Sequence, residues 1–138
     1  MENGNEYLNA DEILAMDDIP TESVTVPEWK NRKVIVCGLT AAAKNAYQSS
    51  LVEMQGKTRK LKLEHATAKL LVRTLVNDKR ETLFTESQIL KLSTKSAAVL
   101  ERLAKVASRL SGMDEEENEA LLKNSEAAQS DDSPTVSL

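Results

Sequence analysis

The fold of this chain is decided by one stretch, Ser23-Val24-Thr25-Val26-Pro27-Glu28-Trp29-Lys30-Asn31-Arg32-Lys33-Val34-Ile35-Val36-Cys37. Apolar and polar side chains alternate over residues 23–26, and a second β-branched run covers residues 33–37, a pattern typical of strands. Pro27 argues for an edge strand or a strand end, because proline has no N–H to donate to a sheet. We therefore predict a β-hairpin over residues 23–37. It needs helices to pack on, since an isolated hairpin is marginal in water.

Downstream of this hairpin, apolar residues recur at the three- and four-residue spacing of amphipathic helices. One such stripe comprises Val99, Leu103, Val106 and Leu110, widened by Leu100 and Ala107. Thr40 and either Ser93 or Thr94 are candidate N-caps, and Thr85 with Gln88 has the spacing of a capping box. These signals predict helices over residues about 40–54, 60–76, 86–91, 94–111 and 115–123. The predicted fold is α+β and mostly α, with the N-terminal hairpin packed on a bundle of about four to five helices.

Charge divides the 138 residues into a basic middle and two acidic ends. Residues 1–28 carry eight acids and no Lys or Arg, and residues 111–138 carry eight acids and one base. We expect residues 1–20 to form a flexible acidic arm with one helical turn near residues 11–15. Residues 21–124 are predicted to form a single globular domain, and residues 125–138 a disordered acidic tail, because polar, charged segments bury too little apolar surface to fold.

The sequence offers little from which a catalytic or metal site could be built. His65 is the only histidine and Cys37 the only cysteine, so neither a catalytic triad nor a Cys-based zinc site can be assembled. The acids at residues 114–117 lack the ligand spacing and turn glycine of a calcium loop. No Gly-rich phosphate loop, membrane span or signal peptide is present in the sequence. We therefore predict a non-enzymatic protein without cofactor or metal.

Five side chains are candidates for binding a partner: Val26, Trp29, Tyr47, Met54 and Phe84. Trp29 has two interpretations, a ring that covers the edge of the helical core or an exposed aromatic anchor, a role in which Trp is over-represented.

The basic middle has a cluster of Lys57, Arg59, Lys60 and Lys62, and this too allows two interpretations. It is either a solvated surface or an electrostatic footprint for nucleic acid. The isoelectric point of about 5.1 and the lack of interleaved aromatic residues argue against nucleic acid.

The order of features along the chain resembles the phage tail assembly chaperone family of long-tailed bacteriophages and prophages. The order is Asp17-Asp18-Ile19, Val24-Thr25-Val26-Pro27-Glu28-Trp29, Val34-Ile35-Val36, Leu39-Thr40, Asp78, Leu83-Phe84-Thr85, and Leu90 to Ser96 before the long helix. The chain departs from the family pattern at two expected turns, where Lys30-Asn31 and Lys79-Arg80-Glu81 stand in place of glycine-containing segments. These departures concern the turn type rather than the core.

The resemblance implies a chaperone that binds the tape measure protein and keeps it soluble while the tail tube assembles. It implies action in the host bacterial cytoplasm and absence from the mature virion. The family resemblance also allows two further partners, the tail tube protein and a longer, frameshifted form of the chain. The alternatives are a small nucleic-acid-associated regulatory protein that uses the basic middle, and a structural tail completion subunit.

Overall fold

The structure is a computed structural model that describes residues 6–113, and within them the fold is α+β. The helices are α1 (Ala10–Ala15), α2 (Ala41–Ser50), α3 (Ala66–Thr74), α4 (Ile89–Leu92) and α5 (Ala97–Leu110), with 3₁₀ turns η1 (Pro27–Trp29) and η2 (Glu86–Gln88). The strands are β1 (Thr21–Val26), β2 (Arg32–Cys37), β3 (Val52–Gln55), β4 (Thr58–Leu61) and β5 (Leu75–Val76). The helix predicted at 115–123 and the tail predicted at 125–138 lie outside the described residues.

The predicted N-terminal hairpin is present as β1 and β2, which pair antiparallel from Thr21 opposite Cys37 to Val26 opposite Arg32. The chain turns through η1, and Lys30 and Asn31 then take left-handed φ angles of 63° and 57°. β5 pairs with β2 and completes a sheet of order β1-β2-β5.

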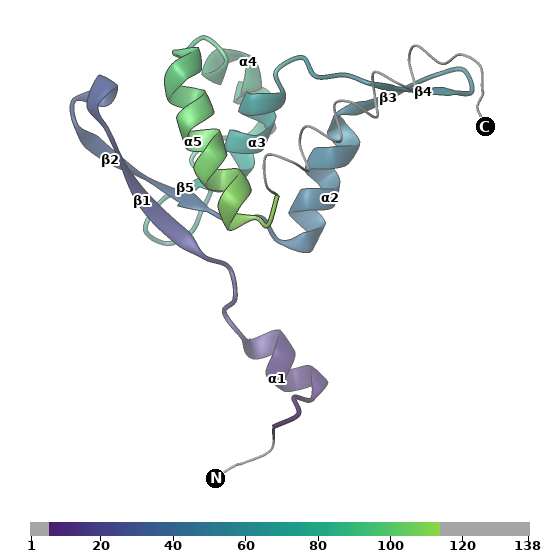
Figure 1. Cartoon of the computed structure of the whole chain (residues 1–138), viewed down its shortest axis with the longest axis vertical. Helices are drawn as coiled ribbons and strands as arrows, with labels where there is room; N and C mark the ends of the chain where they lie inside the picture. The colour runs from purple at the N-terminus through teal and green to yellow at the C-terminus, as the bar shows by residue number, and fades with distance from the viewer. Residues whose placement is uncertain (1–5, 114–138) are drawn as a thin grey trace.

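The core lies where this sheet meets α3 and α5, the helix pair at the centre of Figure 1. The apolar stripe predicted for α5 is buried at Val99, Leu103 and Ala107, whereas Val106 and Leu110 are half-buried at its margin. The N-cap of α5 is neither Ser93 nor Thr94 but Ser96, whose hydroxyl accepts from the Val99 N–H at 3.4 Å. The side chain of Gln88 accepts from the Thr85 N–H at 2.9 Å, as in the predicted capping box.

Two of the predicted helices were wrong in their extent. α2 ends at Ser50 rather than at residue 54, and α3 begins at Ala66 rather than at residue 60. The residues between them form an antiparallel hairpin of β3 and β4, turned at Gly56 with φ 65°. Met54 fits the helical spacing of the sequence but lies on β3 and is 59% exposed, so that spacing does not reflect a buried helix face. The predicted end of α3 was also wrong, since Leu75 and Val76 form β5.

α1 projects away from the remainder of the described chain (Figure 1). A capping box holds its start: the Glu12 N–H donates to Asn9 Oδ1, and the Asn9 N–H donates to Glu12 Oε1, both at 2.9 Å. No residue of α1 is buried, so the body consists of α2–α5 and the two sheets. No helix within residues 6–113 has the length and apolar character that crossing a membrane requires.

Candidate functional site

The five predicted partner-binding side chains do not form one surface. Val26 and Tyr47 are buried in the core, and their side chains offer a partner almost no surface in this conformation. Trp29 and Phe84 are half-buried and pack against the core. Met54 alone of the five is exposed, on β3. Figure 1 shows the β3–β4 hairpin on the opposite side of the body from the β1–β2 turn that carries Trp29.

The β3–β4 hairpin projects from the body as a basic, exposed ribbon, which we call the basic hairpin (residues 52–62; Figure 1). It carries the four bases of the sequence cluster against one acid, Glu53. Lys62 and Glu53 lie 3.6 Å apart as an ion pair, which leaves the charges of Lys57, Arg59 and Lys60 toward solvent. The sequence analysis identified these bases, but it placed Lys57 and Arg59 between two helices and Lys60 and Lys62 at the start of the second helix.

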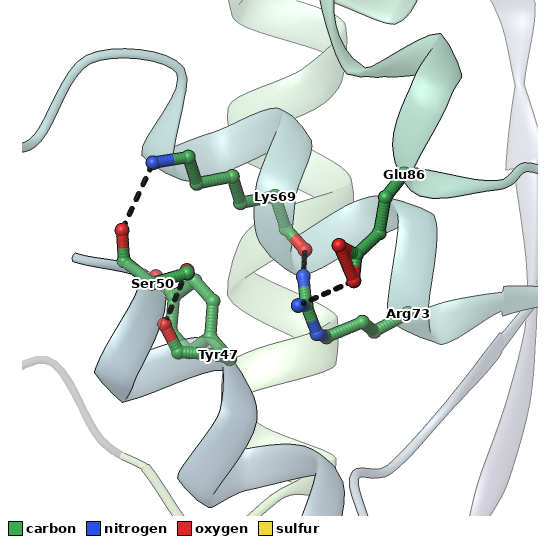
Figure 2. A network of polar contacts seen from close by, with 5 residues as sticks. All are labelled: Tyr47, Ser50, Lys69, Arg73 and Glu86. Carbon is green, nitrogen blue, oxygen red and sulfur yellow. Dashed lines mark hydrogen bonds and ion pairs between the residues drawn. The ribbon is translucent and has the colours of Figure 1, made fainter.

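A polar network fixes the base of the basic hairpin, as Figure 2 shows. The ammonium of Lys69 on α3 donates to the Ser50 carbonyl at the end of α2 at 3.1 Å, and the Ser50 hydroxyl donates to the Tyr47 carbonyl at 2.6 Å. Arg73 donates to the Lys69 carbonyl at 2.8 Å and to Glu86 Oε2 at 3.2 Å. A cation at a helix C-terminus is favourable, because the last carbonyls carry partial negative charge. The network therefore joins α2, α3 and η2 and sets the direction in which the hairpin leaves the body.

Tyr47 enters this network through its backbone carbonyl and not through its phenol. Burial raises the pKa of the Tyr47 hydroxyl above its ordinary value, and the nearby Arg73 opposes that rise. A raised pKa keeps the phenol protonated at neutral pH. Every hydrogen bond drawn in Figure 2 ends on a backbone carbonyl or on Glu86, so the arrangement is structural rather than catalytic.

A shallow depression lies beside the basic hairpin, at the start of α3 and α5. Its volume is about 210 Å³, below the roughly 300–1,000 Å³ of small-molecule pockets. Its wall includes Leu63, Ala66, Ala97 and Leu100, and His65 Nδ1 lies 3.1 Å from Ser93 Oγ. Leu63, 42% exposed, connects the depression with the hairpin. The depression has room for one or two apolar side chains of a protein partner.

The N-terminal segment presents a second exposed apolar surface. We call residues 6–18 the acidic arm, because they carry five acids and no Lys or Arg. Its exposed large apolar residues are Tyr7, Leu8, Ile13, Leu14 and Met16, with Leu14 82% exposed. Exposed apolar side chains gathered on one segment make it a candidate interaction surface.

Three ion pairs join the acidic N-terminal segment to arginines of the body. Arg80 lies 2.7 Å from Asp17, Arg109 lies 2.8 Å from Glu22, and Arg102 donates to both oxygens of Glu28 at 3.0 and 2.7 Å. The hydrogen bonds from Arg102 lower the pKa of Glu28 to about 2.

These pairs also bear on the nucleic-acid alternative. Arg102 and Arg109 lie on α5 within the basic middle, so two bases of that region are paired with acids of the same chain and are less available to nucleic acid.

Among residues 6–113, no cluster of three His, Cys, Asp or Glu side chains is placed to hold a metal ion. The described part of the molecule is thus an α+β body from which two charged, partly apolar segments project. Those are the features of a small interaction protein.

The chain matches the family model for the phage tail assembly chaperone over residues 13–123. It therefore belongs to the phage tail assembly chaperone family, and this membership implies a non-catalytic role. Among solved structures it is similar to the tail assembly chaperone of bacteriophage HK97, with a TM-score of 0.54 and 19% identity over 72% of this chain and 90% of that one. At that identity the likeness shows the fold. No curated protein sequence matches the chain.

Proposed function

We propose that the chain binds the tape measure protein of its phage or prophage and keeps it soluble while the tail tube assembles. The observation that carries this proposal is the family match over residues 13–123, which spans the whole body. The proposed role needs binding without catalysis.

The surface best suited to the tape measure protein is the depression between the starts of α3 and α5, with Leu63 at its edge. An amphipathic helix binds a groove by placing apolar side chains on one face into it. The volume of about 210 Å³ suits one or two such side chains, and His65, Lys95 and Glu101 around it suit the polar flanks of a helix. Met54, exposed on the adjoining hairpin but outside the lining of the depression, stays a proposed secondary contact.

The other predicted partner-binding residues differ in how much of their surface a partner could contact. Trp29 and Phe84 retain part of their surface and stay proposed secondary contacts. Val26 and Tyr47 would take part only if the core opened, so we assign them to packing.

Co-expression of the chain with its tape measure protein tests the function. The soluble fraction of the tape measure protein should rise when the chain is present. An equal soluble fraction with and without it would contradict the proposal.

Two matched variants test the surface. Leu63→Ser should reduce the soluble tape measure protein, whereas Leu90→Ser should not, because Leu90 is 66% exposed on α4 and lies outside the depression. Equal effects of both variants would remove the depression as the site and leave the function standing.

We propose further that the protein acts in the host cytoplasm and is absent from the finished virion, with the tail tube protein and a longer, frameshifted form as additional partners. Mass spectrometry of purified particles tests this. Stoichiometric presence of the chain in particles would favour a structural tail completion subunit instead.

A further inference from the structure

The basic hairpin carries charges that the described part of the chain does not balance. Lys57, Arg59 and Lys60 are exposed, and within residues 6–113 none of them takes part in an ion pair. The one acid of the hairpin, Glu53, is paired with Lys62. Charges of one sign on a short ribbon repel each other, so an acidic segment that lies across them is favourable.

The chain after residue 113 is an acidic segment of this kind. Residues 114–138 carry eight acids and a single base, and five of the acids fall within residues 114–119. The acids at the other end of the chain are partly used, because Asp17, Glu22 and Glu28 are paired with arginines of the body. The C-terminal acids are therefore the better match for the bases of the hairpin.

The last described residues fix the place where this segment leaves the body. Met113 is only 3% exposed, and its N–H donates to the Ser108 carbonyl at 2.8 Å. The Leu39 N–H donates to Ser111 Oγ at 2.9 Å. Leu39 stands two residues before α2, so the segment begins beside the start of α2.

α2 leads from that point to the basic hairpin, as Figure 1 shows. Its ten residues make it about 15 Å long, and six extended residues span about 20 Å. The exposed residues of α2 include Ala41, Ala42 and Ala46, whose small side chains leave room for a chain to pass. The only charged residue on α2 is Lys44, so no acid of this helix repels the segment.

We propose that the acidic segment after Met113, residues 114–132, runs along α2 and docks on the basic hairpin of the same molecule. Its carboxylates face Lys57, Arg59 and Lys60. The docked segment covers these bases, so the hairpin is open to another acidic molecule only when the segment is displaced. This contact goes beyond the proposed function and does not depend on it, because it concerns one molecule alone.

A nitroxide spin label on the segment tests the contact in the full chain. Ser125→Cys combined with Cys37→Ser leaves a single labelling position. In the isotope-labelled protein at low salt, the amide NMR signals of residues 56–60 should lose intensity, whereas those of Arg32 and Lys33 should keep it. The loss should shrink at high salt, because exposed charges are screened.

Two hairpin variants of equal charge change show whether the bases of the β3–β4 hairpin are the site. Arg59→Glu with Lys60→Glu should abolish the loss, because acids then face acids. Arg32→Glu with Lys33→Glu is the matched control, at exposed positions of the β1–β2 hairpin on the opposite side of the body, and it should leave the loss intact. Circular dichroism should show unchanged folding in both, because all four side chains are exposed.

A third variant tests the segment itself. Replacement of the four glutamates within residues 115–119 by glutamine should also abolish the intensity loss, because the segment then lacks most of the charge that reaches the hairpin. Persistence of the loss in this variant would mean that the acids do not hold the segment and would overturn the proposal.

A mixed sample separates contact within one molecule from contact between two. Isotope-labelled chain without the spin label is combined with spin-labelled chain of natural isotope content, and the signals of residues 56–60 should now keep their intensity. An equal loss in the mixture would place the segment on a second molecule and overturn the proposal. Full intensity at residues 56–60 in the doubly labelled protein at low salt, or equal effects of the two hairpin variants, would exclude the basic hairpin as the docking site.

Discussion

The molecule contains two antiparallel hairpins of opposite character. The β1–β2 hairpin gains a third strand from β5, packs against α5 and buries Val26 and Val36 completely. The β3–β4 hairpin has no third strand among the described residues, and apart from the half-buried Val52 and Leu61 its strand residues are exposed. One hairpin is part of the core and the other is held only at its base.

The packed hairpin contributes to the stability of the fold, whereas the exposed hairpin contributes little to it. A two-stranded hairpin is marginal without packing, so the basic hairpin depends on the network of Lys69 and Ser50 that anchors it to α2 and α3. Exposure costs it stability but leaves its side chains available to another molecule. A chaperone needs both kinds of element, a rigid body and surfaces that stay open until a partner arrives.

The largest expected contrast between the hairpins comes from removing one apolar side chain from each. Val36→Ala on β2 should lower the free energy of unfolding by about 2–3 kcal/mol, because it removes buried methyl groups and leaves a cavity. Met54→Ala on β3 should change it by less than about 0.5 kcal/mol, since the side chain is mostly solvated. Urea denaturation followed by circular dichroism measures both. Similar losses would mean that the β3–β4 hairpin is part of the cooperative core.

A smaller contrast in the free energy of unfolding should come from two glycines. Gly38 follows β2, and Gly56 lies in the turn of the β3–β4 hairpin. A Cβ added at Gly38 would lie 2.6 Å from the Leu110 carbonyl oxygen, and a backbone atom cannot move aside cheaply. Gly38→Ala should therefore cost about 2 kcal/mol, as overpacking does. Gly56 has open space around its Cβ position but a φ of +65°, so Gly56→Ala should cost only about 1 kcal/mol, through backbone strain.

The same denaturation experiment checks both glycine variants. A crystal structure of the Gly38→Ala variant should show the end of α5 displaced from β2. If Gly56→Ala were the more costly of the two, the close approach at Gly38 would not be a constraint.

Sequence reasoning predicted the packed hairpin because its burial produces a pattern. β1 places Val24 and Val26 on the covered face, which gives period-two alternation, and β2 is a β-branched run. The apolar stripe of α5 and the capping box of Thr85 and Gln88 could also be predicted, because each depends on residues a few positions apart in the sequence.

The basic hairpin escaped prediction because nothing covers it. Val52 and Met54 alternate with Glu53 and Gln55, but Met54 also continues the helical spacing of Tyr47 and Leu51. Only the two-residue turn beginning at Gly56 separates the two interpretations. β5 could not be foreseen either, because two residues carry no periodicity and their strand character comes from pairing with β2.

The proposed binding surfaces were harder to predict than the fold. Composition located the bases and the acids, yet the depression beside Leu63 depends on how α3 meets α5, which is set by tertiary packing. Leu14 and Ile13 are exposed on the acidic arm, and exposed apolar residues are common on protein surfaces, so exposure alone assigns them no role.

The smallest expected effect concerns the pair of Glu28 and Arg102, one of two ion pairs that tie the packed hairpin to α5. The two hydrogen bonds from Arg102 hold the pKa of Glu28 at about 2, against an ordinary value of 4.5. A carboxyl whose pKa is lower in the folded state stabilises that state fully above its unfolded pKa, and the contribution is lost as pH falls toward the folded value. The contact between η1 and α5 should therefore weaken between about pH 4.5 and pH 2.

Carbon-detected NMR titration of the Glu28 carboxyl measures this directly. Arg102→Gln should move its midpoint from about 2 toward 4.5, whereas Arg59→Gln on the basic hairpin should leave the midpoint in place. The stability change at neutral pH should be slight, because Glu28 and Arg102 are both exposed to solvent and exposed pairs contribute little. A midpoint that stayed near 2 in Arg102→Gln would mean that another group holds Glu28. The packed hairpin would then be tied to α5 by its apolar contacts and by the ion pair between Glu22 and Arg109, while Glu28 would have a different partner.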